Sequence, residues 1–249
     1  VALHHEQDIR KMGGLKSKLP ITYLASLIGS LALIGFPGFS GFFSKDALIE
    51  AIGHANIVGS GFAYASVLIG VFITALYSFR LFFKVFHGRI AEHHCDVKES
   101  PLSITLPLIL LAIPSVMIAW PTVGPMVFGS YFGNSIDQPD AYQIFGYEFT
   151  SAFGFLLHAF SSPVIYIAIF GVLTAYVLYI QKPNFLNDRS LKSTFIYRIL
   201  ENKYYFDDLY ENVFAKQARN IGQNLWSVGD IKIIDNWFVN GTAYRIGNI

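Results

Sequence analysis

Residues 19–52 of this 249-residue chain read LPITYLASLIGSLALIGFPGFSGFFSKDALIEAI. As one continuous helix, residues 20–52 would extend about 50 Å, far beyond the hydrocarbon thickness of about 30 Å. The segment GFPGFSG at 35–41 carries Pro37 and three glycines, which predict a helix break inside the membrane. We therefore predict a discontinuous transmembrane helix in which Lys45 lies one turn beyond the break.

Lys45 is the most informative residue of this stretch. A lysine at membrane depth costs roughly 2.5 kcal/mol or more on insertion scales, so one that is kept generally has a use for its charge. Lysine can also release its proton when desolvated, which arginine cannot. These properties predict a proton-carrying lysine. The alternative is a snorkelling lysine, because Lys45 lies about seven residues, or roughly 10 Å, from Ile52 and its stem is long. The residues alone favour both equally.

Composition indicates a polytopic membrane protein. The chain is 53% hydrophobic and 14% charged, whereas soluble domains are about 25% charged. The net charge of +1 gives no case for nucleic-acid binding. A single cysteine, Cys95, excludes an internal disulfide framework and a cysteine-held iron–sulfur site. The polar opening, LHHEQDIRKMGGLKSK, has no initiating methionine, so we expect a section of a longer polypeptide.

The predicted fold is an all-α integral membrane protein with about four transmembrane helices followed by an amphipathic helix. The predicted spans are the four long apolar segments, at about 20–52, 60–86, 101–120 and 163–181. Two regions follow: 1–185, a transmembrane domain, and 186–249, an amphipathic C-terminal extension.

Basic residues predict the orientation. The loops 1–19 and 87–100 and the region after 181 contain lysine and arginine, whereas 53–60 and 121–162 contain neither. The positive-inside rule places the basic loops on the cytoplasmic or matrix side. The first span then runs from inside to outside, and Lys45 lies in its outer half.

Two segments outside the spans are predicted to lie at the membrane surface. Apolar residues between about 194 and 228 recur every three to four positions among charged ones, which indicates an amphipathic helix. We favour an interfacial or partner-contacting helix over one packed on a soluble domain, because no other soluble core is evident. Residues 141–160 are expected to form a helix at the outer surface.

Several residues are candidates for the proton route beside Lys45. Asp46 either tunes Lys45 or binds across helices, and it does not share a helix face with Lys45. Glu50 is a possible exit carboxylate, although a solvated surface role is favoured. The channel-lining candidates are Tyr23, Ser26, Ser30, Pro37 and Thr74, whose polar members are equally explained by hydrogen bonds between helices.

The histidines do not form a recognisable metal site. His87, His93, His94 and Cys95 cluster in one loop, but their spacing matches no common zinc pattern, so a solvated inner loop is favoured. His158 is expected to be structural, at the outer surface. No flavin, dinucleotide or iron–sulfur motif is present in the sequence.

Four stretches resemble the antiporter-like subunits of proton-pumping NADH:quinone oxidoreductase (respiratory complex I), in particular subunit L, called chain 5 in mitochondria. They are ALHHEQDIRKMGGL at 2–15, GFFSKDALIEA at 41–51, SFRLFFKVFHG at 78–88, and the tail at 201–241. The resemblance covers nearly the whole chain.

The resemblance implies a pair of inverted repeats, each with a broken helix. It implies two half-channels joined by a central polar axis, with Lys45 in the outward one. The inward glutamate–lysine pair and the histidines of the preceding helix are expected before Val1. It also implies a lateral helix beginning in the tail and a final span beyond Ile249.

The resemblance implies a setting as well. FMN, iron–sulfur clusters and quinone are expected on other subunits and none on this chain. The expected partners are other membrane-arm subunits, including further antiporter-like subunits along the lateral helix, within a bacterial or mitochondrial inner membrane. The alternatives are a subunit of a multi-subunit cation/proton antiporter and a purely structural clamp of the membrane arm.

Overall fold

The computed structural model describes residues 2–3, 6–88, 97–129, 131–133, 135, 152–183, 185 and 195–248. The chain divides into two compact units, 1–183 and 184–249, each described here by itself. The described residues form helices and turns, without a strand. This confirms the predicted all-α fold class.

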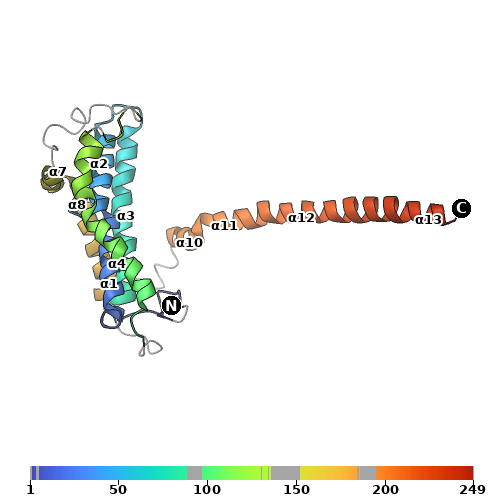
Figure 1. Ribbon diagram of the computed structural model, residues 1–249, viewed down its shortest axis with the longest axis horizontal. Helices are drawn as coiled ribbons and strands as arrows, with labels where there is room; N and C mark the ends of the chain where they lie inside the picture. Colours follow the sequence, from blue (N-terminus) through green and yellow to red (C-terminus); the bar gives the residue numbers. More distant parts are fainter. Residues whose placement is uncertain are drawn as a thin grey trace. The chain divides into compact units, whose positions relative to one another are not determined.

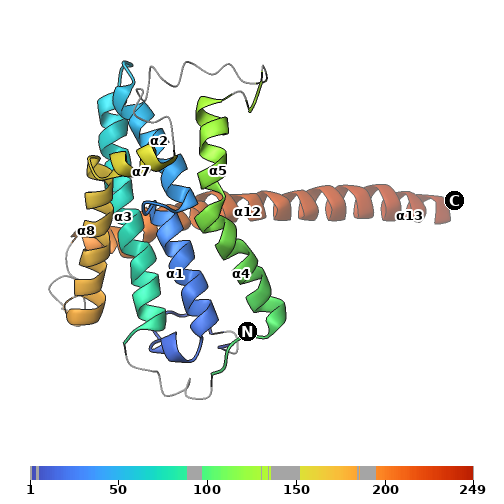
Figure 2. The same cartoon turned by 60° about the vertical axis from the view of Figure 1, so that its left-hand side comes forward.

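The first unit is a bundle of apolar helices (Figures 1 and 2). A short 3₁₀ turn, η1 (Leu15–Ser17), precedes them. The helices are α1 (Pro20–Ile34), α2 (Ser40–His54), α3 (Ser60–Phe86), α4 (Leu102–Met117), α5 (Ala119–Val123), α7 (Ala152–Ala159) and α8 (Pro163–Tyr176). Helical turns of wider pitch extend two of them, η3 (Gly124–Phe128) after α5 and η5 (Val177–Gln181) after α8.

Among the described residues, α3 and the continuous helix Pro163–Gln181 are each long and apolar enough to cross a membrane. The pair α4 and α5 would be a third span, bent by 42°. The predicted span 101–120 therefore changes direction at Ile118 and its helical course continues to Phe128. Two prolines, Pro107 and Pro114, lie inside α4, where a membrane helix tolerates the bending that proline causes.

The first predicted span is discontinuous, as the sequence indicated. α1 has 15 residues and a length of about 22 Å, which is too short to cross alone. α2 carries Lys45, Asp46 and Glu50 and is not apolar enough to count as a span by itself. Figure 2 shows α1 and α2 one above the other alongside α3. Together they cover the length of that 27-residue helix.

α3 and α8 pack closely because small residues line their contact. A Cβ at Gly171 of α8 would lie 2.7 Å from the Cβ of Ala75 and 2.8 Å from the carbonyl oxygen of Phe72, both on α3. The rings of Phe72 and Phe170 stack at 5.5 Å. Close backbone approach through small residues is the usual means of helix association in membranes. α3 therefore forms a fixed support for the broken helix beside it.

Two buried clusters hold the halves of the broken helix. Leu19 and Ile34, just before and at the end of α1, pack with phenylalanines of α3. Phe42 and Phe43 of α2 pack with Phe155 of α7 and with side chains of α5. A third cluster joins Ile49 of α2 to Val71 of α3 and Ala168 of α8, so both half-helices also rest on α3.

The second unit is a helix with one interruption. Its elements are α10 (Phe195–Glu201), η7 (Lys203–Tyr205), α11 (Phe206–Leu209), η8 (Tyr210–Ala215), α12 (Lys216–Asn224), η9 (Leu225–Asn240) and α13 (Gly241–Gly247). Three consecutive non-glycine residues, Lys203, Tyr204 and Tyr205, have positive φ and interrupt the helix. Beyond them the helix continues to Gly247.

Candidate functional site

Gly35 ends α1 at the break between α1 and α2. The backbone N–H of Phe36 donates to the carbonyl of Leu31 at 3.0 Å, and that of Gly35 to the carbonyl of Ala32 at 3.2 Å. Gly35 has φ of 76° and Gly38 has φ of 92°, values that strain any other residue. Two of the three glycines in GFPGFSG are therefore required by backbone conformation.

The third glycine, Gly41, is required by contact. A Cβ at position 41 would overlap the carbonyl oxygen of Ala32, in the last turn of α1. The first turn of α2 thus lies directly against the last turn of α1. The two half-helices overlap side by side at the break.

Lys45 points back toward this break. Its Cδ lies 3.2 Å, and its Cβ 3.8 Å, from the position that a Cβ would take on Gly35. Helical side chains lean toward the helix N-terminus, which for Lys45 is the break and not the Ile52 end. The half-buried side chain therefore lies at the C-terminal end of α1, where the helix dipole is negative. In the described part of the chain it has no ion pair or hydrogen bond.

Asp46 occupies a different face of α2. It is 3% exposed, among the buried residues of α2, which include Phe42, Phe43 and Ile49. It forms no ion pair with Lys45, because adjacent helical residues point about 100° apart. The charged or titratable groups within electrostatic reach of Asp46 are Glu50, on the next turn, and His158 of α7.

Glu50 is half-buried at the far end of α2. Its Oε1 lies 3.9 Å from Nδ1 of His54, and its side chain is 23% exposed. It lines an open pocket of about 310 Å³ with His54, Ser60 and Tyr64. The Glu50 side chain therefore faces an open pocket on one side and is covered by protein on the other.

The bent pair α4 and α5 is hydrogen-bonded to the break, which the sequence did not predict. The hydroxyl of Ser40 donates to the carbonyl of Ser115 in α4 at 2.9 Å. The indole N–H of Trp120 in α5 donates to the carbonyl of Gly38 at 3.0 Å. The ring of Trp120 also contacts that of Phe43 at 5.7 Å. We call Ser40, Ser115, Gly38 and Trp120 the clasp.

The remaining candidates lie apart from Lys45 or are bonded elsewhere. Tyr23 packs on Phe82 and Phe86 at 5.1 and 5.4 Å, at the opposite end of α1 from the break. The Thr74 hydroxyl donates to Gly70 within α3 at 2.7 Å. Ser26 and Ser30 are half-buried along α1.

Pro37 does lie at the break. It borders a cavity of about 200 Å³ between α1, α3 and α8, whose walls are almost entirely apolar. Of the channel-lining candidates, Pro37 is thus the one that the structure places beside the end of α1, where the Lys45 stem also lies.

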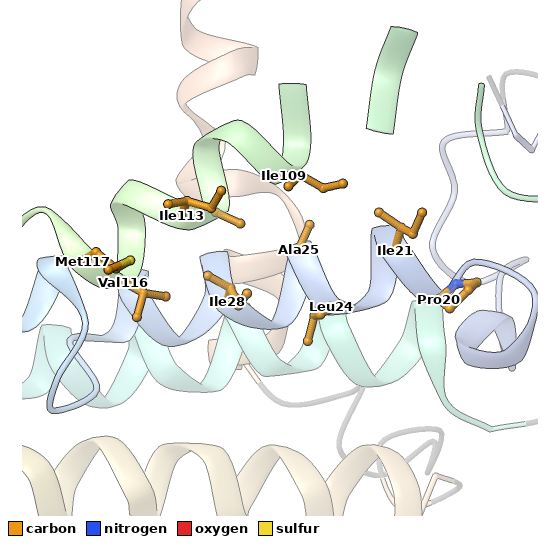
Figure 3. A pocket seen from close by; sticks show the side chains of 10 residues that line it. Pro20, Ile21, Leu24, Ala25, Ile28, Ile109, Ile113, Val116 and Met117 are labelled. Carbon is orange, nitrogen blue, oxygen red and sulfur yellow. The ribbon is translucent and has the colours of Figure 1, made fainter. Parts of the chain in front are cut away.

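A larger hollow between α1 and α4 has no polar chemistry. Figure 3 shows the side chains that line it, from Pro20 to Ile28 on α1 and from Ile109 to Met117 on α4. Its volume is about 670 Å³, and no charged side chain lines it. It offers no group that carries protons.

The other end of α1 is fixed by Glu99. The carboxylate of Glu99 accepts the backbone N–H of Ile21 at 2.8 Å and that of Thr22 at 3.3 Å, and the hydroxyl of Thr22 at 2.7 Å. Burial raises the pKa of Glu99, but these hydrogen bonds, with one from Ser100, outweigh it and lower the pKa overall. A carboxylate 78 residues away thus caps the first turn of α1.

The predicted histidine loop is only partly described. The ring of His87 packs on the rings of Phe82 and Phe83, at 5.6 Å from each, so this histidine is less solvated than expected. His93, His94 and Cys95 lie outside the described residues, as do residues 141–151 of the expected outer helix. α7 covers the rest of that helix to Ala159.

A broken, lysine-bearing helix in an apolar bundle defines a transporter-like membrane protein. Residues 1–74 match the family described as "NADH:quinone oxidoreductase/Mrp antiporter, TM". Over its whole length the chain is 46% identical to NADH-quinone oxidoreductase subunit L of Neisseria meningitidis serogroup B. It belongs to this subunit L and chain 5 family.

Other members of the family are similar over most of the chain. NADH-ubiquinone oxidoreductase chain 5 of Phytophthora infestans is 38% identical over 90% of the chain. NAD(P)H-quinone oxidoreductase chain 5 of a Picosynechococcus species is 32% identical over 92%. The chain spans 40%, 34% and 36% of the lengths of these three relatives, respectively.

Proposed function

We propose that this chain is a proton-translocating membrane-arm subunit of NADH:quinone oxidoreductase, in which Lys45 relays protons in the outward half-channel. The observation that carries the proposal is the direction of the Lys45 side chain, which lies over Gly35 toward the break. A snorkelling lysine would extend toward the interface beyond Ile52. The relatives are named as subunits of NADH-quinone oxidoreductase, the enzyme in which such a relay would act.

The surroundings of Lys45 suit a group that gains and loses a proton. Desolvation by the packed break favours the neutral amine, whereas water or an approaching carboxylate favours the ammonium. The negative end of the α1 dipole stabilises the ammonium without a paired carboxylate. Movement of a nearby charge or of water would therefore switch Lys45 between the two states.

Redox chemistry is assigned to other subunits. FMN, iron–sulfur clusters and quinone would be bound elsewhere in the complex, and this chain would contribute ion movement driven by them. Its partners would be other membrane-arm subunits, including antiporter-like ones along the helix of residues 206–247, in a bacterial or mitochondrial inner membrane. The length of that helix and the amphipathic character of its part Lys216–Asn224 favour this role over a free-standing antiporter.

Two other functions make different predictions. A subunit of a cation/proton antiporter would purify with small membrane subunits alone, whereas a complex I subunit co-purifies with a flavin- and iron–sulfur-containing assembly. A structural clamp would be needed for assembly but not for pumping.

The decisive variant is Lys45→Ala in the full-length subunit within the assembled complex. We expect intact assembly, reduced proton pumping in membrane vesicles and reduced coupled oxidase activity. Lys84→Ala is the matched control, because Lys84 lies near the end of α3 with its ammonium 5.8 Å from the Tyr179 ring. Normal pumping by Lys45→Ala would remove Lys45 from the mechanism, and loss of assembly would favour the structural clamp.

A further inference from the structure

Three titratable residues follow one another along a single face of α2. Asp46, Glu50 and His54 are spaced at i, i+4 and i+8, which stacks them on successive turns. Their exposure rises in the same order: Asp46 is 3% exposed, and the side chains of Glu50 and His54 are 23% and 59% exposed. We call Asp46, Glu50 and His54 the file. It leads from the buried middle of α2 to its exposed end.

The outer two members of the file are in contact. Nδ1 of His54 lies 3.9 Å from Oε1 of Glu50 and 3.0 Å from the Glu50 backbone oxygen. When Nδ1 carries a proton it donates to that carbonyl, which leaves Nε2 as the ring position that takes up or releases a second proton. The imidazole is thus held beside the carboxylate by a main-chain hydrogen bond.

The file ends at a space that admits water. Glu50 and His54 both line the pocket of about 310 Å³, together with Ser60, Gly61 and Tyr64 from the start of α3. The connection 53–60 has no lysine or arginine, which by the positive-inside rule assigns it to the outer side. A proton that reaches His54 is therefore one step from outer water.

We propose that His54 is the terminal proton-carrying group of the outward half-channel, and that it receives protons from Glu50 and releases them to water in this pocket. The inference rests on the proposed function of Lys45, and it adds the route by which the proton leaves.

The route is a series of proton transfers from Lys45 to the pocket water. The Lys45 ammonium gives a proton, through water, to the carboxylate of Glu50, either directly or by way of Asp46, which leaves the Lys45 amine and the Glu50 carboxylic acid. The Glu50 carboxylic acid then gives its proton to the imidazole of His54, which becomes imidazolium. The imidazolium passes the proton to pocket water and returns to its neutral form. Water bridges the intervals, because side chains on successive turns are separated by about 5–6 Å.

His54 also has a purely structural interpretation, which the experiment must separate. It is the last residue of α2, where an imidazolium would stabilise the helix dipole. That role affects stability and assembly, and added imidazole in solution does not restore it. A proton-carrying role is restored by small imidazoles, because the exposed side chain faces an open pocket.

The test is chemical rescue of His54→Ala in the assembled complex. We expect proton pumping per NADH oxidised to fall on the order of tenfold, less than the loss of a general acid–base group usually costs, because pocket water replaces part of the ring's role. Imidazole at millimolar concentration should restore most of it. Glu50→Gln should lower pumping similarly without rescue. Ser66→Ala should pump normally, because Ser66 lies outside the pocket and its hydroxyl bonds to the Phe62 carbonyl within α3.

The outcomes separate this inference from the proposed function. Full pumping by His54→Ala, or reduced pumping that imidazole leaves unchanged, overturns the role of His54 even when Lys45→Ala is impaired. Normal pumping by Lys45→Ala overturns the proposed function itself. If His54→Ala does not assemble, His54→Gln keeps a side-chain donor for the Glu50 carbonyl, and normal pumping by that variant also overturns the inference.

Discussion

Gly41 and Ala32 touch across the break: the Cα of Gly41 lies so close to the Ala32 carbonyl oxygen that a Cβ at position 41 would overlap that oxygen. This contact sets how far the first turn of α2 overlaps the last turn of α1. The overlap in turn places the stem of Lys45 over Gly35. The identity of residue 41 therefore controls where the lysine lies.

Gly41→Ala should destabilise the subunit by about 1–3 kcal/mol, the usual range for overpacking, because the half-helices must separate. Gly29→Ala in α1 is the matched control, since a Cβ there meets nothing within 4 Å and alanine favours helix. Thermal unfolding of the purified complex and the amount assembled on native gels measure both. Equal stability of the two variants would contradict the close contact.

The clasp is expected to hold the break in position. Ser40→Ala removes the donor to Ser115 and should reduce pumping, whereas Ser40→Thr keeps a hydroxyl and should retain it. Trp120→Phe keeps a ring against Phe43 but loses the donor to Gly38. Each lost hydrogen bond should cost about 1 kcal/mol of stability.

Hydrogen exchange at residues 35–41 checks the clasp directly. Exchange should accelerate in Ser40→Ala and Trp120→Phe but not in Ser44→Ala, whose hydroxyl bonds to Gly41 within α2. If exchange at the break is unchanged in the first two variants, the clasp does not hold it.

Local sequence rules explain how much of this site was predictable. The break followed from Pro37 and its glycines, and the separation of Lys45 from Asp46 followed from helix geometry. The four-residue spacing of Asp46, Glu50 and His54 is also readable in the sequence, but a histidine at the end of a helix is equally explained by the helix dipole.

The clasp and the Glu99 cap were not predictable in this way. Ser40 and Ser115 are 75 residues apart, Gly38 and Trp120 are 82 apart, and Glu99 and Ile21 are 78 apart. Their meeting depends on how α4 and the preceding loop return to α1, which no local pattern encodes. The bend at Ile118 was also not predicted, although it has a local cause, because Pro121 lacks the backbone N–H that would bond to the Met117 carbonyl.

Glu99 should make stability depend on pH. Its pKa is lowered from the ordinary value of 4.5, so its contribution is present above that value and is lost as the pH falls through the lower, folded-state pKa. Glu99→Ala should lose about 1 kcal/mol at neutral pH, as for other helix caps, and Glu99→Gln less. Unfolding midpoints at pH 7 and below pH 4.5 measure this. A gap between wild type and Glu99→Ala that does not narrow in acid would argue against the cap.

Asp46→Asn should leave the fold intact and lower pumping. The amide matches the carboxylate in shape at this buried position, but it neither takes up a proton nor attracts one. Asp46→Leu should behave alike in pumping if the carboxylate serves proton transfer only. Loss of assembly in Asp46→Asn would instead assign Asp46 to structural binding across helices.

Lys45→Arg tests the central claim most directly. Arginine keeps the positive charge at the end of α1 but does not release its proton, so a relay fails while a purely electrostatic or snorkelling role survives. The measurement is the number of protons pumped per NADH oxidised by the assembled complex, with Lys84→Arg as the matched control. We predict that Lys45→Arg pumps as poorly as Lys45→Ala and that Lys84→Arg pumps normally. Normal pumping by Lys45→Arg would contradict the account.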